Sequence, residues 1–186
     1  GAFSTFLVLP VQLVLNRQLS GLGVGAYSIP SFTVLAFTEE LFKFLAVYFF
    51  LHRSRLFREP LDAMIYMITG GLGFAAVENI ALLFNTPGAS LLTITVVEQV
   101  VLRFVGATLL HSLASGLIGY FWGLGMLEPR KVRVLIALGI LLATVLHALF
   151  NFLIIVSGPA GFAILFVILF GFFILSDFEK LKRLDS

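Results

Sequence analysis

Long apolar runs alternate with short polar connections along the whole chain. A run of about 20 apolar residues is the length that an α-helix needs to cross the hydrocarbon core of a bilayer. Six such runs can be drawn, near residues 3–19, 29–51, 61–84, 104–127, 133–156 and 160–177. We therefore predict an all-α fold, a polytopic transmembrane helical bundle of about six spans that forms a single domain over residues 1–186.

Among the short polar connections of this pattern, Lys and Arg occur in alternate ones. Three polar segments carry Lys or Arg: Arg53, Arg55 and Arg58; Arg130, Lys131 and Arg133; and Lys180, Lys182 and Arg183. The connections near 20–28, 85–90 and 157–159 carry neither residue. Because positively charged loops remain on the cytoplasmic side of a membrane, the pattern predicts that both termini are cytoplasmic.

Two segments need a separate interpretation. Residues 89–103 are too short to cross a bilayer alone and contain Glu98 and Arg103. We predict that they form a short outer amphipathic or re-entrant helix that leads into the fourth span. The first apolar run lacks a basic n-region and has Arg17 near its end, so we expect a retained span and not a cleaved signal peptide.

Composition agrees with a membrane protein. Hydrophobic residues make up 60% of the chain and charged residues 12%, and the mean hydropathy is +1.08. These values lie outside the range of ordinary soluble domains, so the expected surroundings are a lipid bilayer. The net charge of +2 comes from the Lys and Arg clusters in the connections. These clusters are not interleaved with aromatic residues, and this argues against nucleic-acid binding. Cysteine is absent, so any metal must be bound by histidine and carboxylate groups.

Several ionisable or amide residues interrupt the apolar spans. They are Glu39, Glu40 and Lys43 in the second span, Glu78 and Asn79 in the third, His111 in the fourth, and His147 and Asn151 in the fifth. An ionisable group at membrane depth costs at least about 2.5–3.5 kcal/mol, so each needs a partner or a wet cavity. A helix rise of about 1.5 Å per residue places six of them near the midplane of the bilayer or in its outer half: Glu39, Glu40, Glu78, His111, His147 and Asn151. One shared site is the simplest explanation.

Small residues predict how the fourth span packs. Ala107, His111, Ser115, Gly119 and Gly123 follow one another at intervals of four, so they lie on one helix face. A stripe of small residues allows a neighbouring helix to approach closely. His111 is therefore expected to point into the bundle.

The chemistry that best uses these residue types is the activation of water. Histidine and carboxylate ligands can hold Zn²⁺ while another glutamate accepts the proton of the water. A metal-free version is also open, in which a buried glutamate is the general base and histidine and asparagine stabilise the oxyanion. Glu39 and Glu40 point about 100° apart on a helix, so we expect different roles for them, with Lys43 neutralising one.

Four segments together resemble the PrsW family of membrane proteases. FTEELFKF resembles the family's EExxK motif, FAAVEN its FxxxEN motif, HSLASGLIGYFWG its histidine and glycine segment, and HALFN its HxxxN motif. The family is more remotely similar to the CAAX prenyl protease and bacteriocin-processing superfamily. Relative to the prenyl-protease motifs EExxxR and FxxxH, this chain has Phe44 in place of Arg and Glu78 in place of His.

This resemblance implies proteolysis of a single-span or membrane-anchored protein, with anti-sigma-factor-like substrates, in a prokaryotic cytoplasmic membrane. Carried over, the catalytic residues are Glu39, Glu40, Glu78, His111, His147 and Asn151. Glu39 or Glu40 is predicted to be the general base, with Glu78, His111 and His147 as ligands of Zn²⁺ or water and Asn151 as an oxyanion donor. Two other hypotheses are a proton- or cation-coupled transporter and a non-catalytic scaffold that recruits a membrane partner.

Overall fold

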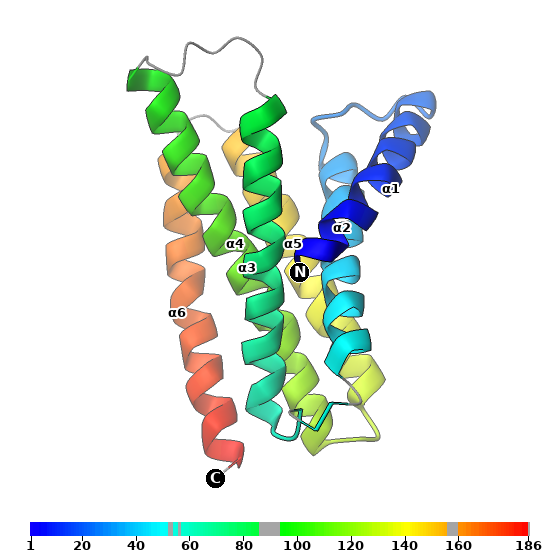
Figure 1. Cartoon of the computed structure of the whole chain (residues 1–186), viewed down its shortest axis with the longest axis vertical. Coiled ribbons are helices and arrows are strands. Elements are labelled where there is room, and N and C mark those ends of the chain that lie inside the picture. Colours follow the sequence, from blue (N-terminus) through cyan, green and yellow to red (C-terminus); the bar gives the residue numbers. More distant parts are fainter. Residues whose placement is uncertain (52–53, 56, 86–93, 156–159, 186) are drawn as a thin grey trace.

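The computed structural model describes residues 1–51, 54–55, 57–85, 94–155 and 160–185, with the side chains of 82–85, 94–103, 160–162 and 184–185 left out. The described residues form a bundle of six helices without strands (Figure 1). The helices are α1 (Ala2–Gly21), α2 (Ile29–Leu51), α3 (Pro60–Asn85), α4 (Ile94–Leu127), α5 (Val132–Ile155) and α6 (Ala160–Asp185). The predicted polytopic helical bundle is confirmed.

Three stretches in the described part of the chain are long and apolar enough to cross a membrane: Pro60–Ala81, Phe104–Leu127 and Val132–Ile155. They belong to α3, α4 and α5. α2 has a suitable length of 23 residues, but its middle carries Glu39, Glu40 and Lys43. These three charged residues, which lower the mean hydropathy of α2, belong to the site that the sequence predicts.

α4 is longer than the predicted fourth span. Residues 94–103 are its first turns and not a separate amphipathic or re-entrant helix, while residues 89–93 lie outside the described residues. No proline or glycine occurs between Ile94 and Val105. Because these are the residues that most readily break or kink a helix, nothing in the local sequence ends the helix before the span begins.

α3 and α4 approach each other closely, as the small-residue stripe predicts. A Cβ atom at Gly71 would lie 2.5 Å from the carbonyl oxygen of His111, and one at Gly119 would lie 2.5 Å from Cα of Met64. A Cβ atom at Gly123 would likewise lie 2.5 Å from the carbonyl oxygen of Pro60. Backbone therefore meets backbone along this interface, and His111 is held at a fixed distance from α3.

The direction of the helices agrees with the charge pattern. The C-terminal ends of α2, α4 and α6 lie at the same end of the bundle (Figure 1). These ends adjoin the three segments that carry Lys and Arg. α1 differs from the predicted full-length span, because it begins beside Gly70 and Gly73 in the middle of α3 and leans away from the bundle toward its other end. The cytoplasmic position of both termini remains a prediction.

Candidate active site

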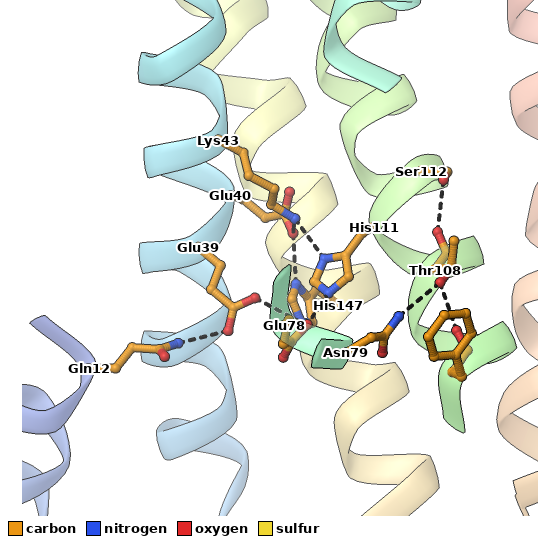
Figure 2. A network of polar contacts seen from close by, with 11 residues as sticks. Gln12, Glu39, Glu40, Lys43, Glu78, Asn79, Thr108, His111, Ser112 and His147 are labelled. Carbon is orange, nitrogen blue, oxygen red and sulfur yellow. Dashed lines mark hydrogen bonds and ion pairs between the residues drawn. The ribbon is translucent and has the colours of Figure 1, made fainter. Parts of the chain in front are cut away.

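Ionisable side chains from four helices meet inside the bundle. α2 contributes Glu39, Glu40 and Lys43, α3 contributes Glu78, α4 contributes His111 and α5 contributes His147 (Figure 2). Glu40 and Lys43 are fully buried, and both histidines are buried. Polar residues from separate spans therefore lie together, which agrees with the single site that the sequence pattern predicts.

Glu40 lies at the centre of one half of this cluster. Its Oε1 accepts hydrogen bonds from Lys43 Nζ at 2.6 Å and from His147 Nδ1 at 2.7 Å. A carboxylate oxygen can only accept, so Nδ1 of His147 carries the proton and a neutral ring keeps a lone pair on Nε2. Glu40 therefore fixes both the tautomer and the direction of His147, in the way that carboxylates orient histidines at metal sites.

Lys43 connects Glu40 to His111. Its Nζ lies 2.9 Å from His111 Nδ1, and Nε2 of His111 lies 2.6 Å from Glu78 Oε2. Because an ammonium group can only donate, Nδ1 of His111 accepts and its Nε2 donates to Glu78. The ammonium group also lies 5.1 Å from the centre of the Phe74 ring. Lys43 neutralises one glutamate, as predicted, and in addition holds His111.

Glu39 points in a different direction from Glu40, as their adjacent helical positions predict. Its Oε1 accepts a hydrogen bond of 2.7 Å from Gln12 Nε2 of α1. Its Oε2 is buried without a hydrogen-bond partner and lies 3.7 Å from Nε2 of His147. The free oxygen of Glu39 and the lone pair of His147 are therefore close enough to bind one common ligand.

A cavity of about 200 Å³ lies between α3, α4 and α5 beside this cluster. Its lining residues are Glu78, Asn79, Ala81, Ala107, Leu110, His111, His147, Phe150, Asn151 and Ile154. The volume is sufficient for several water molecules. The Glu78 side chain is 43% exposed, far more than its partner His111. Asn151, another residue that the sequence analysis singled out, also lines this cavity.

Two polar side chains near the cluster were not singled out from the sequence. Gln12 reaches Glu39 from α1, and Thr108 accepts a hydrogen bond of 3.1 Å from Asn79. The available signal for Gln12 was an amide in the middle of an apolar run. Because α1 carries no ionisable residue near that depth, the sequence pattern did not connect it with the other four helices.

The donor set suits a divalent cation. One donor atom each from Glu39, His111 and His147 lie within 4.8 Å of one another, and all three residues are buried. Neighbouring ligands of a tetrahedral zinc ion are separated by about 3.3 Å when each bond is about 2.0–2.1 Å, which is near the separation of Glu39 and His147. The orphaned Oε2 of Glu39 also fits this interpretation. His111 can serve as third ligand only by releasing one of its two hydrogen bonds.

The expected metal set of Glu78, His111 and His147 differs from this grouping by one residue. Glu78 contacts Nε2 of His111 and occupies the cavity side of the cluster. The carboxylate that lies beside Nε2 of His147 is Glu39, where the sequence analysis expected Glu78.

Sequence comparison places the chain in a known family. A profile described as PrsW family intramembrane metalloprotease matches residues 1–176. The chain belongs to this family. Protease PrsW of Oceanobacillus iheyensis is 29% identical over 178 residues, which cover 96% of this chain and 76% of the relative. Protease PrsW of Geobacillus kaustophilus is 28% identical over 161 residues, covering 86% of this chain and 67% of the relative.

A more distant relative extends the same comparison. Protease PrsW of Bacillus subtilis is 25% identical over 154 residues, covering 82% of this chain and 65% of the relative. No solved structure matches the chain. The resemblance drawn from the four sequence segments is confirmed, and membership of the PrsW family supports a hydrolase of the protease type over a transporter or a scaffold.

Proposed function

We propose that this protein is an intramembrane endopeptidase that cleaves a peptide bond in a single-span or membrane-anchored protein. The observation that carries the proposal is the convergence of Glu39, Glu78, His111 and His147 from four helices beside a cavity large enough for water. Family membership supplies the reaction class. The geometry supplies the groups that such a hydrolysis requires.

A divalent cation such as Zn²⁺, when bound, would polarise the substrate carbonyl and lower the pKa of the attacking water. Glu39, His111 and His147 are the residues that would hold it. Glu40 keeps His147 in the tautomer whose Nε2 can serve as a ligand. When both histidines are neutral and Glu39, Glu40 and Glu78 are ionised, the positive charge of Lys43 offsets only one of the three carboxylates. A divalent cation balances the negative charge that remains.

Glu78 is the best placed general base. Its carboxylate borders the cavity and is partly exposed, so it can accept a proton from water there and return it to the leaving amine. Glu40 is unsuited to this role because it is fully buried and its Oε1 already accepts from both Lys43 and His147. In this proposal Glu78 takes the role of general base that the sequence interpretation gave to Glu39 or Glu40, and Glu39 replaces Glu78 among the ligands. The amide of Asn151 lines the same cavity and can donate to the developing oxyanion.

One observation favours the metal-independent alternative. Both ring nitrogens of His111 are already engaged, by Lys43 and by Glu78. In that mechanism Glu78 still accepts the proton of the water, while Nε2–H of His111 orients its carboxylate. Metal content and the effect of chelation distinguish the two versions.

The position of the cavity supports a proposal about which side of the membrane supplies water. Ala81 and Ile154 line it near the C-terminal ends of α3 and α5, at the end of the bundle opposite to the basic segments. With the basic segments cytoplasmic, the site opens toward the outer half of the bilayer. A prokaryotic cytoplasmic membrane and an anti-sigma-factor-like substrate with one span are the setting that we propose.

The test is cleavage in proteoliposomes of purified protein. The reporters are single-span membrane proteins of the anti-sigma-factor type with a different tag at each end. Wild-type protein should cleave at least one reporter, whereas Glu78→Gln and His147→Gln should each abolish the product. Glu128→Gln is the control, because Glu128 lies outside the cluster in an exposed ion pair with Lys131. Wild-type rates in both site variants would refute the proposed mechanism.

A further inference from the structure

Gln12 links α1 to the polar cluster through a single side-chain hydrogen bond to Glu39 (Figure 2). We propose that Gln12 is a positioning residue that sets the direction of the Glu39 carboxylate. This inference rests on the proposed function. Gln12 does not line the cavity, so it acts through Glu39 and not on the substrate.

The surroundings of Gln12 make its partner important. Phe6, Leu9 and Leu13 on the same helix are exposed large hydrophobic residues that face the expected lipid. An amide without a partner is costly in such surroundings, because lipid offers no hydrogen bond. A carboxylate can only accept hydrogen bonds, so the amide group must present its NH₂ to Glu39. The contact therefore has a defined donor and acceptor.

The hydrogen bond constrains the carboxylate as a whole. Oε1 of Glu39 is held at 2.7 Å by Gln12, and the two oxygens share one rigid plane. Fixing Oε1 leaves Oε2 directed toward Nε2 of His147 at 3.7 Å, with no other hydrogen bond. Without the donor, the terminal torsion of a glutamate is broad, and Oε2 would spend less time in this direction.

α1 is attached to the rest of the bundle on one side. In the described part of the chain, α1 contacts α2 and α3 but not α4, α5 or α6. It therefore contacts neither of the helices that carry His111 and His147. The direct polar connection between α1 and the site is Gln12, so loss of its amide should change the site without altering the α4–α5 packing.

The first test compares two identical substitutions on α1. Gln12→Met removes the donor at nearly constant volume, and Gln18→Met makes the same change at an exposed position near the end of the helix. In the proteoliposome assay we expect kcat of Gln12→Met to fall roughly 10- to 100-fold with little change in KM, the range for residues that orient ligands. Gln18→Met should retain the wild-type kcat. Equal kcat values for the two variants would overturn the inference.

The second test does not depend on cleavage. Melting temperatures in detergent are measured for wild type, Gln12→Met, Glu39→Met and the double variant. A Gln12–Glu39 bond predicts that Gln12→Met lowers the melting temperature in the wild-type background but much less beside Glu39→Met. Additive shifts would show that the two side chains do not interact, whatever the activity. If Gln12→Met does not fold, Gln12→Asn shortens the amide by one methylene and enters the same comparison.

Failure of the proposed function gives a different result. If the wild type does not cleave any reporter but the melting temperatures show a strong Gln12–Glu39 coupling, the proposed proteolysis is contradicted. The role of Gln12 in positioning Glu39 for proteolysis is then overturned as well. An active wild type, an inactive Glu78→Gln and a fully active Gln12→Met would leave proteolysis standing and overturn only the role of Gln12.

Discussion

Replacement of Lys43 by methionine tests the electrostatics of the site most directly. Lys43 is fully buried, and its Nζ lies 2.6 Å from Glu40 and 2.9 Å from His111. Methionine has a similar length and keeps the packing against Phe74, but it removes the positive charge. Glu40 would then retain only His147 as a hydrogen-bond donor, and Nδ1 of His111 would lose its donor.

The size of the effect follows from burial. Breaking a buried ion pair by removing one partner costs about 3–5 kcal/mol, because the remaining charge is left uncompensated. The lost bond to His111 adds about 1 kcal/mol. We therefore expect Lys43→Met to lower the free energy of unfolding by about 4–6 kcal/mol. The double variant Glu40→Gln with Lys43→Met removes both charges and should recover most of this loss.

The chain provides a closely matched control. Lys131 and Glu128 form an ion pair with the same i,i+3 spacing and the same Nζ–Oε distance of 2.6 Å, but their side chains are 67% and 57% exposed. Lys131→Met should cost no more than about 1 kcal/mol, the usual limit for an exposed pair. Spacing and distance are equal in the two pairs, so the difference reflects the burial of Lys43 and its additional bond to His111.

The assay is reversible unfolding of the purified protein in mixed micelles, followed by circular dichroism. Similar losses for Lys43→Met and Lys131→Met would refute the argument that the buried pair stabilises the cluster. No recovery in the double variant would show that the cost of Lys43→Met lies elsewhere, for example in packing.

Two further predictions concern helix spacing and metal binding. Gly71→Ala places a Cβ atom 2.5 Å from the carbonyl oxygen of His111, so α3 and α4 must separate. The cleavage rate should therefore fall about 100-fold. Gly21→Ala is the control and should cleave at the wild-type rate, because its Cβ atom would meet no atom within 4 Å. Unchanged cleavage by Gly71→Ala would show that the site tolerates this displacement. Metal analysis should find about one Zn²⁺ per chain, lost in Glu39→Ala and retained in Glu78→Ala. The opposite result would restore the ligand set expected from sequence, and metal-free active protein would establish the glutamate mechanism.

Much of the fold was accessible from sequence because a bilayer limits the possibilities. Apolar runs of the length of a membrane span and alternating basic connections predicted six helices, and the stripe that contains His111 predicted the close α3–α4 interface. The depth of each residue along its helix also predicted that Glu40, Glu78 and His147 lie in one layer of the membrane. These features depend on periodicity and helix rise, which the sequence carries directly.

The partners within the layer were not accessible in the same way. Helix rise gives the depth of a side chain in the membrane but not the neighbouring helix that the side chain faces. The neighbour depends on the rotation of each helix about its axis and on the order in which the helices are arranged in the bundle. The ligand set therefore contained Glu78 where the structure groups Glu39. Gln12 was missed because α1 contributes one amide and no ionisable group at that depth. The start of α4 was misplaced because polar residues at 98 and 103 resemble an interfacial helix.

The contacts of Lys43 have a practical consequence for any mutational study of this protein. His147, Glu40, Lys43, His111 and Glu78 form one unbroken series of hydrogen-bonded groups. A change at either end alters how every intermediate member is held, so single substitutions will each look indispensable and will not rank the five residues. Only combinations of substitutions, in which the second change costs little once the first is present, can separate a group that reacts from one that supports it.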